Sequence, residues 1–556
     1  MTVILPKAKA AISWPRQRAA IAVLSAPLLL SSAVWILRDR RVWPWDPAWY
    51  GQVTIELWQI RAQGIGAWLD AMIHAMGFKP PLLVWAGQFF VPFRHLTGSV
   101  ESALLFMNIA LAAGAIVLIC YTAQSLGLGT MAILAGAMAC AGSQIFIGLT
   151  HQYLVELAQG VTIAALMLIA VGAKKRSATR TLSLAILTAS LGLSIKTTSL
   201  MFILPLGGYI GIALLVNRVR IEKLATVPRW RGSDLAFVLS AVAATAAAVT
   251  WYAINWHLMA QHFVNATTGE VALNYGSAGP LLSKLAFWIS FLSLAISPFL
   301  IISIGVSALI IIAVVIGIVR VLEAQPSHWL PCAIRSGTLF AITLTGTIVA
   351  TLLAYSLQIN EDTRFLMPII PMIGVLVAWS LNVLSQRLVS LAFLVVFAIN
   401  AAVNHAYAHG INPFDMRPFP WLLQVHLSAE DRETLAQTVD VTCSGDAPQK
   451  YKVIGVEYPE FNANSASFYS AKRGLRAGYR CNYTSLGYAE TDAQRAWDRI
   501  MALGADYVVT IAPEKQRSPD FVNGVSRQIA ERLAHDQRFV RVPQSRAGIW
   551  IFARPP

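Results

Sequence analysis

Five charged residues stand at or near the edges of long apolar runs that carry little other charge. Two are carboxylates, Asp46 and Glu156, and three are cations, Lys79, Lys196 and Arg364. A carboxylate can accept a proton, and Lys or Arg can neutralise an anionic group such as a phosphate. Each residue alone could simply reach from an apolar segment to the membrane surface. If all five lie at one depth, they could form a single polar site beneath that surface.

The local sequence around Asp46 leaves its role open. The segment reads RDRRVWPWDPAWYGQVTIELWQI, and Asp46 followed by Pro47 is typical of a helix start, with Asp as the N-cap and Pro in the first turn. The nearby tryptophans predict a helix that lies among lipid headgroups. On these residues alone, Asp46 is as well explained by capping as by catalysis.

The chain that must position these residues is more apolar than a soluble protein. Of its 556 residues, 56% are hydrophobic and 13% are charged, and the mean hydropathy is +0.58. Soluble domains carry about 25% charged residues. The net charge of +15 is concentrated in short basic clusters between apolar runs, as cytoplasmic loops and lipid-facing surfaces require. We therefore expect a polytopic α-helical membrane protein that contacts membrane lipids and no nucleic acid.

Long apolar runs predict about eleven transmembrane helices, at roughly 17 to 25 residues for each crossing. They cover residues 19–37, 101–123, 130–149, 157–173, 181–195, 199–216, 235–256, 288–319, 336–357, 365–384 and 388–405. The first run has no clear cleavage site and is interpreted as an uncleaved span. The run 288–319 is long enough to include an interfacial piece.

The basic clusters predict which loops face the cytoplasm. Clusters lie at 174–180 and 218–231, and Arg320 and Arg335 flank a third loop. Positive loops stay cytoplasmic, so with the N-terminus inside, an even number of crossings must precede Lys174, as the first four runs provide. The same parity places loops and tail on the outer, periplasmic face at 38–100, 150–156, 196–198, 358–364 and beyond about 406. The outer face therefore collects all five charged residues.

The segment 81–93 is apolar but too short to cross the membrane. Thirteen residues cover about 20 Å as a helix, whereas the hydrocarbon core is about 30 Å thick. A crossing here would also break the charge parity. We expect a re-entrant or interfacial helix in the outer loop 38–100, with Pro80 and Pro81 stiffening its start beside Lys79.

The sequence divides into a membrane domain, 1–405, and a polar domain, 406–556. In the second, we expect helices at about 428–440, 491–503 and 521–536 and strands at 451–458, 506–511 and 548–554, which is an extracytoplasmic α/β domain. It shows no metal-ligand spacing and no nucleophile or phosphate motif, so scaffolding or acceptor binding is its expected role. Cys443 and Cys481 could form a disulfide there or remain free thiols.

Five motifs, taken in order, resemble the GT-C-type integral membrane glycosyltransferases. They are DPAWY, FKPPLLVW, the acidic residue in YLVELAQ, SIKTTSLMFILP and EDTRFLMPIIPMIGVL. The resemblance covers roughly residues 17–405 and is greatest to the branch that contains protein O-mannosyltransferases and lipid A aminoarabinose transferases. Each motif alone is weak, but their order and shared outer-face placement make the match fairly specific.

The resemblance implies inverting transfer of a sugar from a polyprenyl-phosphate donor to a lipid, glycan or protein acceptor on the outer side of the inner membrane. It makes Asp46 the catalytic aspartate and Glu156 a second acidic residue. It also assigns donor-phosphate binding to Lys79, Lys196 and Arg364. No cofactor is certain, and a divalent cation, Mg²⁺ or Mn²⁺, would have to lie between the two carboxylates. The chain departs from many relatives in having Asp46-Pro47 instead of Asp-Glu, and Glu156 instead of aspartate.

Two rival interpretations predict other features. A secondary transporter would show internal repeats, broken helices and charges near the membrane midplane, and no clear repeat is visible. A flippase or ligase for a lipid-linked glycan with a diphosphate-linked donor should carry its arginines in a large loop between late spans, whereas here the large loop is the first. The polar loop 257–287 could cover the site or be an ordinary loop.

Overall fold

The fold is described from a computed structural model. The description covers residues 14–221, 232–269, 272–273, 275–323, 337–412, 414, 429–443, 451–477, 481–487, 490–512, 520–543 and 548–555.

The described residues include ten helices that are long and apolar enough to cross a membrane, and a bent helix pair makes an eleventh. The ten are α1 (Trp14–Arg38), α6 (Val100–Ser125), α9 (Val155–Gly172), α10 (Ala178–Ile195), α11 (Leu200–Ile221), α12 (Gly232–Thr267), α14 (Leu300–Leu322), α16 (Thr338–Ser356), α17 (Ile369–Val383) and α18 (Arg387–Ala408). The pair is α7 (Thr130–Ala141) and α8 (Gln144–Thr150), bent by 60°. The chain is therefore a multi-pass membrane protein, as its sequence predicts.

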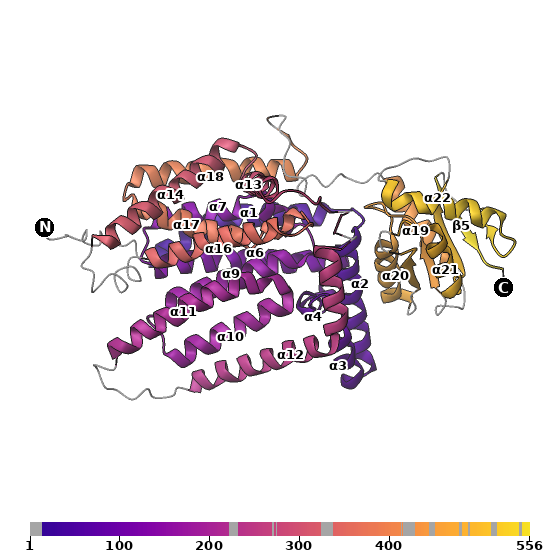
Figure 1. The fold of residues 1–556 in the computed structure, drawn as a ribbon, viewed down its shortest axis with the longest axis horizontal. Helices are drawn as coiled ribbons and strands as arrows, with labels where there is room; N and C mark the ends of the chain where they lie inside the picture. The colour runs from indigo at the N-terminus through magenta and orange to yellow at the C-terminus, as the bar shows by residue number, and fades with distance from the viewer. Residues whose placement is uncertain are drawn as a thin grey trace.

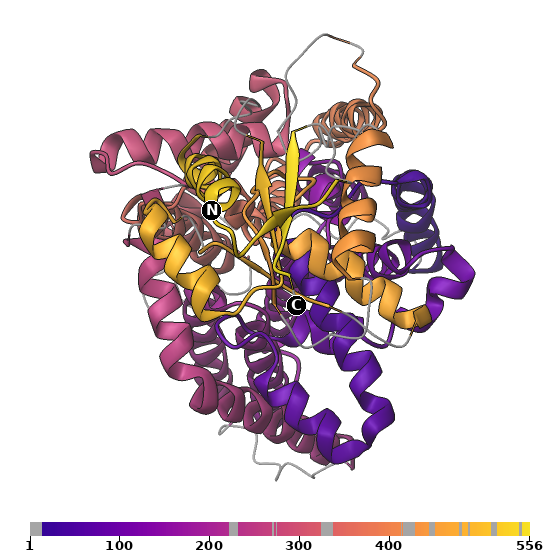
Figure 2. The ribbon, with the colours of Figure 1, turned by 90° about the vertical axis from the view of Figure 1, so that its right-hand side faces the viewer.

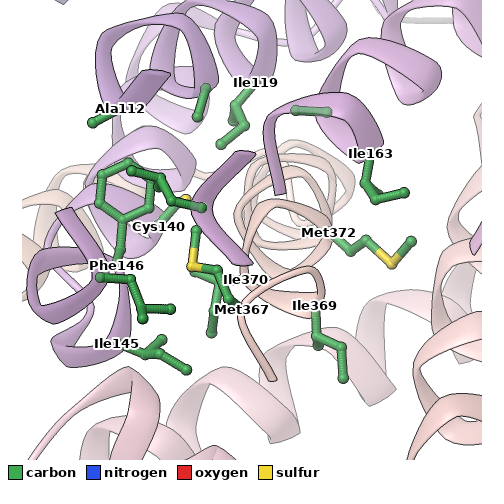
Figure 3. Close-up of a cluster of buried hydrophobic side chains, with 14 of the residues drawn as sticks. Ala112, Ile119, Cys140, Ile145, Phe146, Ile163, Met367, Ile369, Ile370 and Met372 are labelled. Carbon is green, nitrogen blue, oxygen red and sulfur yellow. The ribbon is translucent and has the colours of Figure 1, made fainter. Parts of the chain in front are cut away.

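Helix α17 lies at the centre of the bundle. Its side chains are buried from Ile369 to Leu381, as expected of a helix that is apolar on all sides. A Cβ atom on Gly136 of α7 would lie 2.3 Å from the carbonyl oxygen of Gly374, so only glycine allows these two helices to approach so closely. The side chains packed around them form a continuous apolar core (Figure 3). This core fixes the polar loop that comes directly before α17.

Two predicted segments have different boundaries in the structure. The apolar run 288–319 is divided into α13 (Leu281–Ile296) and α14, because Pro298 cannot continue a helix; only α14 is long enough to span. The expected loop 257–287 is also much shorter, since α12 continues to Thr267 and α13 begins at Leu281. The sequence left a cover over the site and an ordinary loop as alternatives here, and both now concern only the shorter stretch between α12 and α13.

The loop between α1 and α6 folds into short helices across one end of the bundle. They are α2 (Trp45–Ile60), η1 (Arg61–Gln63), α3 (Ile65–His74), α4 (Leu82–Gly87), η2 (Val91–Phe93) and α5 (Arg94–Thr97). Figure 1 shows α2 and α3 running at right angles to the spans. The short segment 81–93 contributes the six-residue α4, which is about 9 Å long, and the three-residue η2, and both are too short to cross the bundle.

Helix α4 is anchored by its own buried side chains and by a glycine. Leu83 and Val84 are buried in the membrane core. A Cβ atom on Gly87 would lie 1.9 Å from Tyr153 Oη, which itself contacts Thr54 Oγ1 of α2 at 3.0 Å and Leu83 O at 3.1 Å. Overpacking here would displace α4. This close contact holds the segment that begins with Lys79 against α2.

The polar domain is a five-stranded sheet with helices on its faces, in the strand order β2-β1-β3-β5-β4. The strands are β1 (Tyr451–Ile454), β2 (Asn482–Ser485), β3 (Tyr507–Ile511), β4 (Val540–Arg541) and β5 (Ile549–Ala553). Strands β1, β2 and β3 are parallel, and β5 is antiparallel to β3 and β4. The helices are α19 (Ala429–Thr442), α20 (Ala463–Ala477), α21 (Ala493–Ala502) and α22 (Asp520–His535).

All three expected strands and all three expected helices are present, but the sequence analysis missed β2, β4 and α20. The expected start of the first helix, at about residue 428, lies outside the described residues. Cys443, directly after α19, is joined to Cys481, directly before β2, by a disulfide. The sequence had left this bond and two free thiols as alternatives.

Helix α20 docks the polar domain onto α2. Ser465 Oγ donates a hydrogen bond to the carbonyl oxygen of Trp43 at 2.8 Å, and the rings of Phe468 and Trp43 stack with centroids 5.0 Å apart. A Cβ atom on Gly51 would lie 2.7 Å from the Phe468 ring, so the glycine permits this contact. Figure 2 looks onto this end of the molecule, where the sheet lies in front of the bundle.

Candidate active site

A cavity of about 1260 Å³ lies between the end of the bundle and the polar domain. Its walls come from the start of α2, the segment before α4, the start of α9, the end of α10 with the turn that follows it, the end of α12, the loop before α17 and the polar domain. All five charged residues named from the sequence line it: Asp46, Lys79, Glu156, Lys196 and Arg364. Segments more than 300 residues apart in the chain therefore meet in one space.

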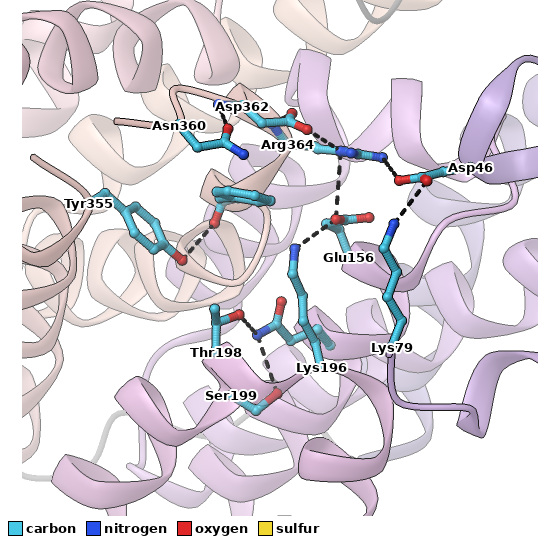
Figure 4. A network of polar contacts seen from close by, with 12 residues as sticks. Asp46, Lys79, Glu156, Lys196, Thr198, Ser199, Tyr355, Asn360, Asp362 and Arg364 are labelled. Carbon is cyan, nitrogen blue, oxygen red and sulfur yellow. Dashed lines mark hydrogen bonds and ion pairs between the residues drawn. The ribbon is translucent and has the colours of Figure 1, made fainter. Parts of the chain in front are cut away.

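The five side chains form one network of ion pairs (Figure 4). Lys79 Nζ lies 2.8 Å from Asp46 Oδ1, and Arg364 Nη1 lies 3.1 Å from Asp46 Oδ2. Arg364 Nε lies 3.8 Å from Glu156 Oε1, which is also 2.7 Å from Lys196 Nζ. Arg364 therefore bridges the two carboxylates, and each carboxylate has a lysine of its own.

Asp46 is not the N-cap that its sequence predicts. Helix α2 begins at Trp45 with Pro44 as the N-cap, and no side chain caps it. The Asp46 carboxylate turns away from the backbone toward Lys79 and Arg364, because two full positive charges attract it more strongly than neutral amides do. Between the two roles that the sequence left open, capping is thus excluded.

The cations around Asp46 also set its proton affinity. Burial by itself would raise the pKa of the Asp46 carboxyl group. Lys79 and Arg364 outweigh burial and hold that pKa well below its usual range. In this arrangement Asp46 is an ionised carboxylate but a weak base.

A strained turn aims Lys79 into the network. Met76, with φ 68°, and Gly77, with φ 45°, are both in the left-handed region, which costs energy at a residue that has a Cβ atom. Helix α12 stabilises the preceding chain, since Trp251 Nε1 donates to Ala75 O at 3.0 Å. The ammonium group of Lys79 lies 5.4 Å from the centre of the Trp49 ring. Its position is therefore set from two sides.

Glu156 and Lys196 stand at helix ends whose dipoles suit their charges. Glu156 is in the first turn of α9, and Lys196 directly follows α10. Glu156 is only 2% exposed, so its charge depends on the nearby cations. Lys196 Nζ also lies 4.0 Å from the centre of the Phe365 ring.

A sixth charged residue, Asp362, orients Arg364 and was missed in the sequence. Asp362 Oδ2 accepts a hydrogen bond from Arg364 Nε at 2.6 Å, and Asp362 Oδ1 accepts one from the Arg364 backbone N–H at 3.2 Å. The loop is tied to the end of α12, where Ile359 N–H donates to Thr267 O at 2.9 Å. An acidic residue two positions before Arg364 was the available signal.

The polar domain supplies wall residues that the sequence analysis also missed. Glu457 follows β1, and Tyr483 lies on β2; both line the cavity. Trp45, which precedes Asp46, donates through Nε1 to Glu457 Oε2 at 3.0 Å. Ligands of α/β sheets bind beyond the carboxyl ends of parallel strands, and Glu457 occupies that position after a strand that the sequence did predict.

The candidate metal ligands do not fit a metal ion well. Both oxygens of Asp46 and Oε1 of Glu156 already contact cationic side chains. Across the described ranges, no three His, Cys, Asp or Glu side chains gather as a metal site. The Glu156 Oε2 atom is buried without a hydrogen-bond partner. A divalent cation would have to displace lysine or arginine from this network.

Comparison with solved structures identifies the fold. ArnT from Cupriavidus metallidurans bound to undecaprenyl phosphate has a TM-score of 0.57 at 13% identity, and the match covers 96% of this chain and 98% of that one. The same protein in the apo state gives 0.53 at 11% identity, with the same coverage. The arabinofuranosyltransferase AftD from Mycobacteria gives 0.52 at 13% identity and covers 98% of this chain but 40% of that one.

The sequence comparisons add no relative, because no family model and no curated protein matches the chain. The structural matches extend over nearly the whole chain and include both the bundle and the polar domain. The chain therefore has the fold of the GT-C-type integral membrane glycosyltransferases, as its motifs predict.

Proposed function

We propose that this chain is an inverting glycosyltransferase that moves a sugar from a polyprenyl-phosphate donor to an acceptor hydroxyl group on the periplasmic side of the inner membrane. The observation that carries the proposal is the pairing of Asp46 with Lys79 and Arg364 in a cavity at the end of the bundle. A base and an anion site next to each other are what such a transfer requires.

The donor phosphate would be held by Lys79, Lys196 and Arg364. Arginine and lysine form strong, charge-assisted hydrogen bonds to phosphate oxygens. The solved ArnT structure contains undecaprenyl phosphate, which supports a polyprenyl phosphate as the lipid part of the donor. The network has three cations and three carboxylates, so an arriving phosphate competes with Asp46, Glu156 and Asp362 for these partners.

An apolar groove near Lys196 suits the prenyl chain. It has a volume of about 460 Å³ and lies between α10 and α12, where Leu193, Ala248, Val249 and Trp256 line it. Tyr252 is also part of this groove, and its Oη is 3.3 Å from the Oγ1 atom of Thr197, which follows Lys196. A lipid chain in the groove would bring its phosphate end to the cations.

Donor binding would activate Asp46. While Lys79 and Arg364 hold the Asp46 carboxylate, its low pKa makes it a poor proton acceptor. A phosphate that draws these cations away lets that pKa rise toward its usual range. The charge pairs therefore favour an ordered reaction in which the donor binds before the acceptor is deprotonated.

The transfer step then balances as a displacement. The acceptor oxygen attacks the anomeric carbon while its proton passes to Asp46, and the bond from that carbon to the phosphate oxygen breaks with the electron pair going to the leaving group. The phosphodiester, with one negative charge, becomes a prenyl phosphate with a second charge, which the three cations stabilise. Attack from the side opposite the phosphate inverts the anomeric centre.

The orientation in the membrane is part of the proposal. The basic cluster 174–180 lies at the end of the bundle opposite the cavity, because it connects α9 to α10 beyond their far ends. The positive-inside rule would then place this loop and the N-terminus in the cytoplasm, with the cavity and the polar domain outside. The Cys443–Cys481 disulfide supports an oxidising compartment for that domain.

The test is sugar transfer by the purified protein in lipid, with a panel of radiolabelled polyprenyl-phosphate sugars. We expect Asp46→Asn to lower kcat by about 10²- to 10⁴-fold, as loss of a general base does. Asp70→Asn is the matched control, because Asp70 belongs to the same outer loop but its side chain is 76% exposed and lies outside the cavity. The same assay with a chelator asks whether a divalent cation contributes.

A transporter would behave differently in this assay. If labelled sugar crosses the membrane without release of polyprenyl phosphate, and Asp46→Asn equals the wild type, the chain shares only the fold of these enzymes.

A further inference from the structure

We propose that Trp45 and Glu457 form the acceptor subsite, and that the acceptor's reacting end is a neutral, hydroxyl-rich carbohydrate without phosphate. This inference rests on the proposed function and names the acceptor class for the same cavity. It is drawn from the polar-domain wall, which faces the ion-pair network. Neither donor binding nor proton acceptance by Asp46 uses the residues of this wall.

The polar-domain wall differs in charge from the membrane wall. Its described residues contribute the carboxylates of Glu457 and Glu460, side-chain amides and hydroxyl groups, and no lysine or arginine. Arg499 lies outside the cavity lining, and its Nε donates a hydrogen bond to the carbonyl oxygen of Ser485 at 3.1 Å. Arg41, on the membrane side, is already bound by Asp39, with Nε to Oδ1 at 2.7 Å and Nη2 to Oδ2 at 3.0 Å.

This charge distribution disfavours an anionic acceptor. A phosphate or carboxylate on the acceptor would face like charges on Glu457 and Glu460 with no cation to pair with on that wall. It would be drawn instead to Lys79, Lys196 and Arg364, where it would compete with the donor. A neutral sugar avoids both conflicts, because its hydroxyl groups can donate to carboxylates and amide oxygens.

Trp45 and Glu457 together have the features of a sugar-binding pair. The Trp45 side chain is held by its Nε1 hydrogen bond to Glu457 Oε2, yet the residue remains 40% exposed beside Asp46. An indole ring offers a flat apolar surface on which the apolar face of a pyranose can pack. Within the part of the chain that the structure describes, Glu457 Oε1 has no hydrogen-bond partner, so it can accept from a hydroxyl group.

The pair is fixed from both sides. Trp45 is the first residue of α2, next to the base, and the backbone N–H of Glu457 donates to Asn523 Oδ1 at 3.0 Å. A sugar stacked on Trp45 would therefore be adjacent to Asp46 without touching the phosphate site. This is the placement that an attacking hydroxyl group requires.

The experiment measures binding and transfer separately in the full-length protein in lipid. Three probes are used: a neutral alkyl disaccharide, the same glycoside carrying a phosphate, and a Ser/Thr-containing peptide. We expect the neutral glycoside to bind best, and we expect Trp45→Ala and Glu457→Ala each to weaken its binding about tenfold. Binding of undecaprenyl phosphate should stay unchanged in both variants.

One conservative variant and one distant variant serve as controls. Trp45→Phe keeps an aromatic surface and should retain most of the glycoside binding, whereas a general loss of folding would affect undecaprenyl phosphate as well. Glu531→Ala changes an exposed carboxylate of α22 and should have no effect.

The outcomes separate this inference from the proposed function. Tighter binding of the phosphorylated glycoside or the peptide, or binding that is unaffected in both alanine variants, overturns the subsite even if sugar transfer occurs. If the neutral glycoside binds through Trp45 and Glu457 but no polyprenyl-phosphate sugar is ever consumed, the subsite stands and the transferase proposal fails.

Discussion

The two walls of the cavity hold their polar groups in different ways. The membrane wall holds three cations and three carboxylates within one ion-pair network, where Glu156 is deeply buried and Arg364 is partly buried. On the polar-domain wall, the Glu457 carboxylate is held by a single hydrogen bond from Trp45, which remains 40% exposed. Fixed charge therefore lies where the proposed donor always presents a phosphate, and adaptable polar surface lies where acceptors approach.

The difference also predicts how each wall responds to amino-acid substitution. Buried charges lose their hydration and are stabilised only by each other, so removal of one leaves its partners uncompensated. A single hydrogen bond on a partly exposed wall contributes much less. Substitutions in the membrane wall should thus affect folding and chemistry together, while those in the polar-domain wall should change acceptor affinity alone.

Arg364→Ala should have the largest effect, because Arg364 contacts Asp46, Glu156 and Asp362 at once. We expect activity to fall by about 10³-fold and the free energy of unfolding to fall by about 3 kcal/mol or more. Transfer kinetics and thermal unfolding in the same lipid would measure both. Arg61→Ala is the control, since Arg61 is exposed on the Trp58 ring outside the cavity. A large loss of activity with unchanged stability would mean that the network is not the structural unit inferred here.

Lys79→Ala should have a smaller effect that falls on the donor. Lys79 gives one charge-assisted hydrogen bond to the site, and losing such a bond to a phosphate costs about 1.5 to 3 kcal/mol. We expect the KM for the donor to rise about 10- to 100-fold, with little change in the KM for the acceptor. Steady-state kinetics with each substrate varied in turn would show the split. Lys175→Ala, on an exposed loop at the opposite end of the bundle, should leave both constants unchanged.

The same contrast explains how much the sequence could predict. The spans follow from apolar run length, and Asp46, Lys79, Glu156, Lys196 and Arg364 were recognisable because charge is rare beside such runs. What the sequence could not supply was the contact between distant segments. The bridge made by Arg364 and the loss of the Asp46 cap both depend on the loop before α17 meeting the start of α2 at one end of the bundle.

The polar-domain wall was harder to predict for a related reason. Helix α20 and strand β2 lie in a stretch rich in Ser, Asn and Tyr, where large apolar residues are few. Glu457 was visible in a predicted strand, but its pairing with Trp45 crosses more than 400 residues. Ordinary polar residues on a soluble domain carry no sign in the sequence that they face a membrane cavity.

Gly51→Ala tests whether the two walls are held together through α2. The added Cβ atom would lie 2.7 Å from the Phe468 ring and 3.1 Å from the Trp43 ring, so the docking of α20 must loosen. We expect a destabilisation of about 1 to 3 kcal/mol and a severalfold rise in the KM for the acceptor, with donor binding intact. Gly66→Ala is the control, because nothing lies within 4 Å of its added Cβ atom. If the KM for the donor rises instead, Gly51 supports the membrane wall and not the position of the polar-domain wall.

The last predicted effect is a pH dependence that only the polar-domain wall should show. Burial raises the pKa of Glu457 to about 7, although the hydrogen bond from Trp45 opposes the shift. If the ionised carboxylate receives a hydroxyl group of the acceptor, affinity is complete above pH 7 and is lost as the pH falls through 7. The KM for the acceptor should therefore rise by up to about tenfold between pH 8 and pH 6.

The donor should not follow this profile, because the cations keep Asp46 ionised throughout the range while no donor is bound. Glu457→Gln cannot titrate, so the KM for the acceptor should become independent of pH between 6 and 8 in this variant. Kinetics with each substrate varied at several pH values would measure both profiles. If the wild-type dependence persists in Glu457→Gln, another group titrates, and the two walls do not divide the substrates between them as inferred. If the pH dependence of the KM disappears in Glu457→Gln for the acceptor alone, protonation of Glu457 controls acceptor binding, while the ion-pair network of the membrane wall stays fully charged.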